Sequence, residues 1–321
     1  MWLLIAAGAL FILALGVTFF AYHTAFYSRP RRDEDPYALP KGEQYEAAAD
    51  KMRALITELE RRPFEPVGIR AFDGVELYAR YYHVRDGAPL QIQFHGYRGN
   101  ALRDFCGGHR LALEAGHNVL LIDERANGRS GGHTITFGVK ERRDCLAWAQ
   151  YAQERFGDVP IFLVGVSMGA ASVLMASELP LPENVAGIVA DCPYSSPEAI
   201  IRRVCAENMP LSGAVMPFVR LAARLFGGFD LRGASAVEAV KHTDIAILLL
   251  HGEDDRFVPC SMSREIHAAG RTTRLVTFPG AGHGLSYIAD EARYAAEVEV
   301  FIGTCIGRYG SVRADSFSTE G

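Results

Sequence analysis

Three kinds of hydrophobic pattern follow one another along the chain. The amino-terminal stretch from Trp2 to Tyr22 is almost wholly apolar, and it contains no Asp, Glu, Lys or Arg. From Glu43 to about Arg62, apolar positions recur at helical spacing and predict an amphipathic helix. Beyond Val67, short apolar runs alternate with helical stretches, which indicates strands separated by helices.

The apolar run is long enough to cross a membrane. As a helix, about 20 residues cover roughly 30 Å, the thickness of a bilayer's hydrocarbon core. A cleaved signal peptide is the main competing interpretation, but no positive residue precedes the run, which is also longer than a usual signal core. Residues 1–28 are therefore predicted to be a transmembrane anchor. Arg29, Arg31 and Arg32 follow it, and the positive-inside rule then places the rest of the chain in the cytoplasm.

Residues 29–63 are predicted to hold a charged, proline-rich linker and the amphipathic helix, which Pro63 ends. Because both charge signs occur on this helix, we expect it to pack on the globular body rather than on a membrane surface. The body itself is predicted to span residues 64–306. The polar segment 307–321 is expected to be a flexible tail.

The body has the pattern of an α/β fold. Val67–Phe72 and Val75–Tyr82 flank Asp73-Gly74 and predict an antiparallel hairpin. Later strands are predicted at Leu90–Phe94, Val119–Ile122, Ile161–Val164, Ile188–Ala190, Ile245–Leu250 and Leu275–Phe278, and helices near 101–115, 138–156, 168–178, 261–269 and 287–302. Short apolar strands alternating with helices indicate a mostly parallel sheet covered on both faces. The long connection at about 195–240 is typical of an active-site lid, the alternative being two helices that only pack on the body.

Composition narrows the classes of function. The formal net charge of −5, without a basic cluster, argues against a nucleic-acid partner. The six cysteines show no C-x-x-C pair and no metal-ligand spacing, so they are expected to be buried hydrophobes in a reducing compartment. We expect no cofactor and no metal.

The segment Gly165-Val166-Ser167-Met168-Gly169 carries the candidate chemistry. It follows an apolar strand and opens a helix of small residues, and a strand that turns so sharply into a helix leaves room only for glycines at the two flanking positions. Such a turn exposes the serine oxygen. A phosphate-binding loop is excluded because no Lys-Ser/Thr follows the glycines.

A serine needs a base and an orienting acid before it acts as a nucleophile. Both residue types follow in the expected order. The strand at 245–250 leads into a loop with two acids, Asp254 and Asp255, and His283 stands between glycines after the strand at 275–278. Of the ten histidines, His283 alone combines a place after the acids with a tight loop at a strand end.

From about Val67 to Phe301, the chain resembles the α/β-hydrolase fold serine hydrolases at four motifs in the right order. The resemblance implies Asp255 as the acid, with Asp254 as the alternative, because His251 to Pro259 matches H-G-x-x-D-x-x-V-P. It also implies backbone N–H donors for an oxyanion at Tyr97 and Met168. His95 and His251 then have structural roles.

Two further segments belong to the resemblance. Residues 123–132 match the D-x-R-x-x-G-x-S pattern, apart from Asn127 where a histidine is common, and Tyr194 is a candidate substrate contact. The resemblance implies acyl transfer on a small-molecule carboxylic ester. A membrane anchor and an apolar lid favour lipid-derived esters or acyl thioesters. A serine peptidase of the same fold and a non-catalytic binding module are the alternatives. A dinucleotide-binding site at Gly280-x-Gly-x-Gly is excluded, because the motif lacks the βαβ context of such a site.

Overall fold

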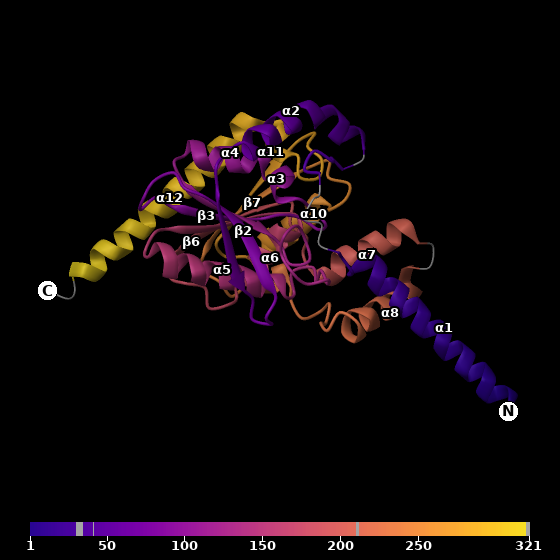
Figure 1. Ribbon diagram of the computed structural model, residues 1–321. Coiled ribbons are helices and arrows are strands. Elements are labelled where there is room, and N and C mark those ends of the chain that lie inside the picture. Colours follow the sequence, from indigo (N-terminus) through magenta and orange to yellow (C-terminus); the bar gives the residue numbers. More distant parts are fainter. Residues whose placement is uncertain (30–34, 41, 210–211, 319–321) are drawn as a thin grey trace.

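A mixed sheet of eight strands organises the body in the computed structural model, which describes residues 1–29, 35–40, 42–209 and 212–318 (Figure 1). The strand order is β1-β2-β4-β3-β5-β6-β7-β8. The strands are β1 (Glu65–Arg70), β2 (Glu76–Tyr82), β3 (Leu90–Phe94), β4 (Asn118–Asp123), β5 (Ile161–Val166), β6 (Val185–Asp191), β7 (Ala246–Gly252) and β8 (Thr273–Phe278). Each of the predicted strands is present, with ends that shift by up to three residues.

The antiparallel edge and the parallel centre have different sequence causes. β2 pairs antiparallel with both β1 and β4, and the hairpin turns at Gly74, whose φ of 84° suits glycine. From β4 to β8 the neighbouring strands are parallel. β3 and β4 are buried along their whole length, as expected for strands covered on both faces. The predicted α/β-hydrolase type of sheet is confirmed.

Helices cover both faces of the sheet and enclose two hydrophobic cores. One face carries α5, α6, α9 and α10, and the other carries α2, α3, α4, α11 and α12. Their bounds are α2 (Glu43–Glu60), α3 (Ala101–Asp104), α4 (Cys106–Glu114), α5 (Glu141–Phe156), α6 (Met168–Ala176), α9 (Ala236–Ala239), α10 (Cys260–Ala269), α11 (Ser286–Ala289) and α12 (Glu291–Ser318). The amphipathic helix α2 packs on the body through its apolar stripe, as predicted.

The expected flexible tail is replaced by helix. α12 continues through the polar segment to Ser318, whereas residues 319–321 lie outside the described part of the chain. Two contacts explain why the helix passes residue 307. Cys305 is buried against the sheet, and the Tyr309 hydroxyl reaches a carboxylate oxygen of Asp158 at 2.5 Å. Residues 307–311 of this helix are mostly exposed, which agrees with their polar composition.

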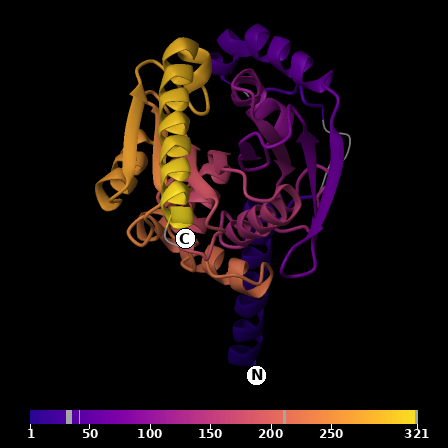
Figure 2. The same ribbon diagram turned by 90° about the vertical axis from the view of Figure 1, so that its left-hand side faces the viewer.

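Helix α1 (Trp2–Ala25) projects away from the body, and α8 (Ser212–Leu225) lies beside it (Figures 1 and 2). Among the described residues, α1 alone is long and apolar enough to cross a membrane, with a mean hydropathy of 2.6. Most of its side chains up to Val17 are exposed, whereas Thr18 and Phe26 are buried. Arg31 and Arg32, which underlie the predicted orientation, lie outside the described residues.

Candidate active site

Ser167 stands in the sharp turn between β5 and α6. Its φ of 56° and ψ of −113° lie outside the regions that L residues favour, and its N–H donates to the Asp191 carbonyl at 2.8 Å. The two flanking glycines make the turn feasible. A Cβ on Gly165 would lie 2.4 Å from the Gly169 backbone, and a Cβ on Gly169 would lie 1.9 Å from the Phe94 carbonyl oxygen. The predicted steric reason for the motif is thus visible in the backbone.

His283 links the serine to an acid. Its Nε2 lies 2.9 Å from Ser167 Oγ, and its Nδ1 lies 2.6 Å from Asp255 Oδ2. These three side chains come from loops at the carboxyl ends of β5, β7 and β8. In a parallel arrangement those ends meet at one edge of the sheet, which explains how residues 116 positions apart come together.

Asp255 is held as a carboxylate. Oδ1 accepts hydrogen bonds from the N–H groups of Phe257 and Val258 at 2.9 and 2.8 Å. Burial raises the pKa of Asp255, but hydrogen bonds and electrostatic interactions with His251 and His283 outweigh burial and lower it to about 2. Asp254, the alternative acid, is exposed. The structure thus brings Asp255, and not Asp254, to His283.

His95 and His251 are buried in hydrogen-bonding positions, as the sequence predicts. His95 Nε2 accepts from the Glu124 N–H at 3.0 Å, and its Nδ1 donates to the Gly96 carbonyl at 2.8 Å. His251 lies between Ser263 Oγ and the Val258 carbonyl. Neither histidine lies in a hydrogen bond with Ser167.

The predicted oxyanion loop lies directly against the serine. A Cβ on Gly96 would lie 3.3 Å from Ser167 Cβ, so only glycine allows this approach without displacement. Two interactions fix the backbone of the loop: the Gly96 N–H donates to Asp104 Oδ2 at 3.0 Å, and Asn100 caps α3. Within the described part of the chain, the N–H groups of Tyr97 and Met168 have no protein acceptor. Both donors are therefore free for an oxygen atom of a ligand.

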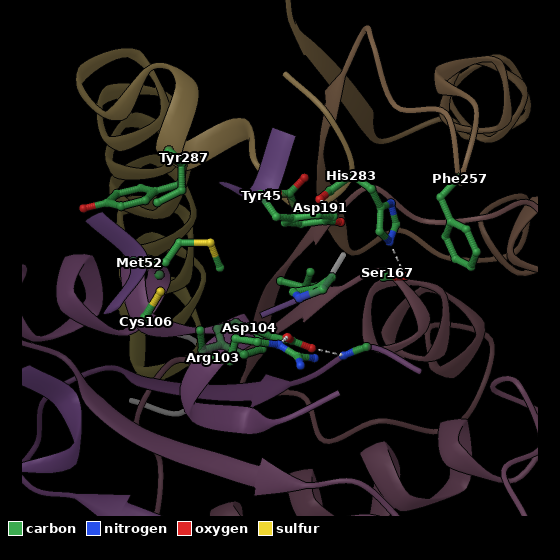
Figure 3. A pocket seen from close by; sticks show the side chains of 18 of the residues that line it. Tyr45, Met52, Arg103, Asp104, Cys106, Ser167, Asp191, Phe257, His283 and Tyr287 are labelled. Atoms are coloured by element: carbon green, nitrogen blue, oxygen red, sulfur yellow. Dashed lines mark hydrogen bonds and ion pairs between the residues drawn. The ribbon is translucent and has the colours of Figure 1, made fainter. Parts of the chain in front are cut away.

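A cavity of about 490 Å³ opens beside Ser167 and His283. Figure 3 shows Tyr45 opposite the serine, with Met52, Cys106 and Tyr287 gathered at the end of the cavity away from it. The Tyr45 hydroxyl donates to the His283 carbonyl at 2.9 Å, and burial raises the pKa of that hydroxyl, so it stays protonated. The volume and the mixed lining are typical of a small-molecule site.

Comparisons with known proteins agree with this geometry. Residues 92–241 match the family model described as alpha/beta hydrolase fold. An esterase from Pyrococcus furiosus superposes with a TM-score of 0.62 at 20% identity, covering 87% of this chain and 98% of that one. Est1E from Butyrivibrio proteoclasticus, with ferulic acid bound, gives a TM-score of 0.58 at 22% identity over 75% of this chain and 99% of its own. The chain has the α/β-hydrolase fold.

Sequence relatives of this α/β-hydrolase include proteins named as lipases and a protein without an assigned activity. It is 25% identical to the uncharacterized protein YqkD of Bacillus subtilis, over 94% of this chain and 96% of the other. It is 24% identical to Lysophosphatidylserine lipase ABHD12 of Danio rerio, over 62% of this chain. This hydrolase spans about half the length of the ABHD12 relatives, 51% in that case. The relatives support a hydrolase activity.

Two sequence expectations about the pocket find no counterpart among the described residues that line the cavity. Tyr194 is not among the described residues that line the cavity, because its ring is 2% exposed and packs in the core near Phe137. The insertion at about 195–240 forms α7 (Pro197–Asn208), α8 and α9, but the described residues of this insertion do not line the cavity either. α8 packs on α1 and α7 instead. α2 contributes Gln44, Tyr45 and Met52 to the cavity lining.

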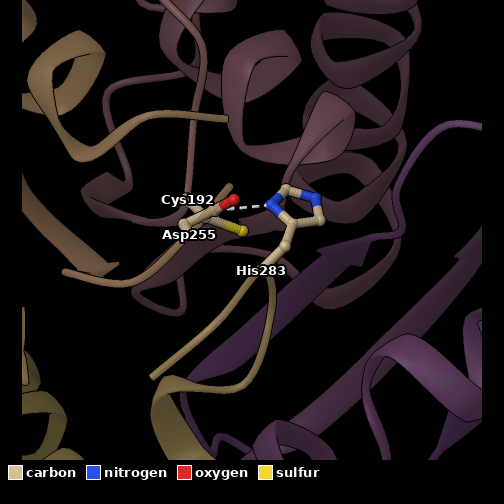
Figure 4. Close-up of side chains that lie close together, drawn as sticks. All are labelled: Cys192, Asp255 and His283. Atoms are coloured by element: carbon tan, nitrogen blue, oxygen red, sulfur yellow. Dashed lines mark hydrogen bonds and ion pairs between the residues drawn. The ribbon is translucent and has the colours of Figure 1, made fainter. Parts of the chain in front are cut away.

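Cys192 lies next to the acid and the histidine (Figure 4). Ligand atoms of Cys192, Asp255 and His283 are within 4.8 Å of one another, which is a spacing that a metal ion would need. Burial raises the pKa of the Cys192 thiol well above its usual range, and the carboxylates of Asp191 and Asp255 add to the effect. A protonated thiol is a poor metal ligand, and Asp255 already bonds His283. The cluster therefore fits a hydrogen-bonded acid and base better than a metal centre.

Asp191 and Tyr45 also line the cavity, and neither was singled out as a site residue from the sequence. Asp191 lines the cavity, its Oδ1 accepts from Ser286 Oγ at 3.2 Å, and burial raises the pKa of its carboxyl to about 6. The sequence contained a signal for this role, because Asp191 is the last residue of a parallel strand. Tyr45 carried no such signal. Helical spacing shows that one face of the helix is buried, but it does not show which part of the protein that face covers.

Proposed function

We propose that this protein is a serine hydrolase that cleaves acyl esters, with Ser167 as the nucleophile, His283 as the general base and Asp255 as the orienting acid. The observation that carries the proposal is the unbroken chain of hydrogen bonds from Ser167 Oγ through His283 to Asp255. Nucleophile, base and acid are each within hydrogen-bond reach of the next, which is the arrangement that acyl transfer needs.

The reaction follows from these positions. His283 Nε2 takes the proton of Ser167 as Oγ attacks the ester carbonyl carbon, and the carbonyl electron pair moves onto the oxygen. The Tyr97 and Met168 N–H groups donate to that oxyanion. As the intermediate collapses, the C–O bond to the leaving alcohol breaks and His283 returns the proton to the alcohol. Water, deprotonated by His283, then releases the acid from Ser167 by the same steps.

An acyl lipid with one chain and an anionic head group is the substrate class that the cavity favours. Met52, Cys106 and Tyr287 give the cavity a largely apolar end away from Ser167. Arg103 and Arg256 also line it, although Arg103 is already paired with Asp104 at 2.8 Å. The relatives named as lysophosphatidylserine lipases act, by their name, on a lipid of this class.

Helix α1 supports a membrane location for this activity. From Trp2 to Val17 the helix is largely free of the body and measures roughly 24 Å, somewhat less than the hydrocarbon thickness of a bilayer. If α1 spans the membrane, the body must therefore sit close to the lipid head groups. α8 packs beside α1 on the side of the body from which α1 projects. Leu221 and Leu225 on α8 are exposed, and contact with lipid would cover them.

Hydrolysis assays on full-length protein test the proposal. The wild-type protein should release fatty acid from lysophospholipids and from short p-nitrophenyl esters, and Ser167→Ala should lose at least about 10³-fold in kcat. Ser177→Ala is the matched control, because Ser177 is buried in a hydrogen bond to Leu174 in the same region and lies outside the cavity lining. Equal activity of the two variants would refute the proposed nucleophile. Turnover of peptides without turnover of esters would favour the peptidase alternative.

A further inference from the structure

The carboxyl-terminal end of α1 is bonded to the loop that carries the predicted oxyanion donor. The last carbonyls of a helix lack partners within the helix. Here the Tyr97 hydroxyl donates to the Ala25 carbonyl at 2.9 Å. Arg98 Nη2 donates to the carbonyls of Thr24 and Tyr27, each at 2.9 Å. Two consecutive residues of one loop thus satisfy three carbonyls at the end of the apolar helix.

Electrostatics and packing strengthen this connection. A guanidinium at a helix carboxyl terminus interacts favourably with the helix dipole, and its fork can serve two carbonyls at once. The Tyr97 ring stacks on Phe137, with centroids 4.8 Å apart and an interplanar angle of 27°. Phe137 in turn meets Phe26, which directly follows α1 and is fully buried. The loop and the end of α1 therefore share side-chain packing as well as hydrogen bonds.

The backbone of the loop depends on such support. Arg98 has a φ of 47°, a left-handed conformation that costs free energy for a residue other than glycine. The neighbouring turn is closed by the Gly99 N–H, which donates to the Gly96 carbonyl at 2.9 Å. Since the peptide N–H of Tyr97 lies between Gly96 and this strained residue, its direction is sensitive to how the Arg98 side chain is anchored.

We propose that the end of α1 positions the oxyanion loop through Tyr97 and Arg98, so that the apolar helix contributes to the rate of the chemical step and not only to the location of the protein. This inference rests on the proposed function, because it concerns the same serine and the same oxyanion. Tyr97 and Arg98 act here as positioning residues through their side chains. The oxyanion donor itself remains the Tyr97 backbone N–H.

The consequence is a selective loss of kcat. Oxyanion donors interact mainly with the transition state, so a misdirected N–H lowers kcat and leaves KM nearly unchanged. Tyr97→Phe keeps the backbone donor and the ring but removes the hydroxyl bonded to Ala25. We expect a fall in kcat of about fivefold, the factor that one ordinary net hydrogen bond corresponds to. Arg98→Ala removes two bonds and a charge, and should cost roughly tenfold or more.

The test uses full-length protein in phospholipid vesicles and a short, soluble p-nitrophenyl ester. kcat, KM and the melting temperature are measured together with the affinity for an alkyl boronic acid, whose boron accepts the Ser167 oxygen and forms a tetrahedral adduct. Tyr151→Phe is the matched control, because it likewise removes a hydroxyl that takes part in one hydrogen bond, here accepted from Arg155, outside the cavity lining. Arg98→Lys retains a cation at the helix end.

The inference predicts lower kcat and weaker boronate binding for Tyr97→Phe and Arg98→Ala, with KM within about twofold of wild type, and recovery of much of the kcat in Arg98→Lys. Unchanged kcat in both variants relative to Tyr151→Phe would overturn it. A rise in KM without a change in boronate affinity would also overturn it, because that pattern indicates a general structural role. Wild-type turnover that persists in Ser167→Ala would instead refute the proposed function.

Discussion

His251 Nε2 lies 3.3 Å from Asp255 Oδ2, the same oxygen that lies 2.6 Å from Nδ1 of His283. Two imidazoles therefore share one buried carboxylate oxygen. His251 Nδ1 is 2.6 Å from Ser263 Oγ, so the serine hydroxyl can donate to Nδ1 and leave the proton of His251 on Nε2, which lies 2.8 Å from the Val258 carbonyl and 3.3 Å from Asp255 Oδ2. This arrangement keeps Asp255 ionised. It also fixes the orientation of the carboxylate toward His283.

Asp255→Asn should abolish most of the activity. The amide preserves the volume of the side chain but removes the negative charge that stabilises an imidazolium, and we expect kcat to fall by about 10³–10⁴-fold. Asp254→Asn is the control, since Asp254 is exposed one residue away. Steady-state kinetics at pH 7.5 measure both. Similar losses in the two variants would mean that the acid has been assigned wrongly.

Asp191 should make the stability of the folded protein depend on pH. Burial raises the pKa of its carboxyl from 3.8 to about 6. Below pH 3.8 the carboxyl is protonated in both states, and as the pH rises towards 6 the unfolded chain ionises first, so the folded state loses stability. The amide that Asp191→Asn introduces cannot titrate. Relative to wild type, this variant should therefore gain stability between pH 4 and pH 6, on the order of 2 kcal/mol, and then level off.

Urea unfolding in detergent micelles at several pH values measures this difference, with Asp254→Asn as the reference variant. A difference between Asp191→Asn and wild type that stays constant from pH 4 to pH 7 would contradict a raised pKa for the buried Asp191 carboxyl at the wall of the cavity.

Met52 should set the length of acyl chain that the protein prefers. It lines the end of the cavity away from Ser167, and truncation to alanine lengthens the space there. Met52→Ala should shift the optimum of kcat/KM towards longer chains in a series of p-nitrophenyl esters. Leu55→Ala is the matched control on the same helix, because Leu55 is equally buried but does not belong to the cavity lining. A shift of the same size in both variants would show that the effect comes from loosened packing of α2.

Charges in α1 should release the protein from membranes. Leu10 and Leu13 are exposed on the free part of the helix, and each arginine placed there costs about 2.5–3.5 kcal/mol of insertion free energy. The double variant Leu10→Arg/Leu13→Arg should leave the membrane fraction, whereas Val300→Arg, an exposed apolar position on α12, should stay. Fractionation with an alkaline wash measures this. Full retention of the double variant would argue against a spanning α1.

The parts of the site that sequence predicted are those fixed by local backbone geometry. Gly165 and Gly169 signal the turn at Ser167 because a Cβ at either position would collide with the backbone nearby. His283 is marked by a similar place at a strand end. These residues meet because parallel strands bring their carboxyl ends to one edge, and the strand pattern already implied such a sheet.

The parts that sequence did not predict depend on long-range docking. Tyr45 reaches His283 across 238 residues, and the periodicity of α2 does not say which surface the helix covers. Tyr194 was placed at the pocket because it follows β6 closely. Cys192, however, has a φ of 48°, and the chain turns there so that Tyr194 enters the core while Asp191 faces the cavity. A backbone turn at a residue other than glycine leaves little trace in the sequence.

The central claim is that Ser167 is a nucleophile activated by His283. Labelling with a fluorophosphonate tests it most directly, because fluoride leaves as a stable phosphonyl bond forms to the activated oxygen. Mass spectrometry of the digested protein should find the adduct on Ser167 in the wild type, and Ser167→Ala and His283→Ala should label at least about 100-fold more slowly. Equal labelling of Ser167→Ala, or an adduct on another residue of the wild type, would contradict the account.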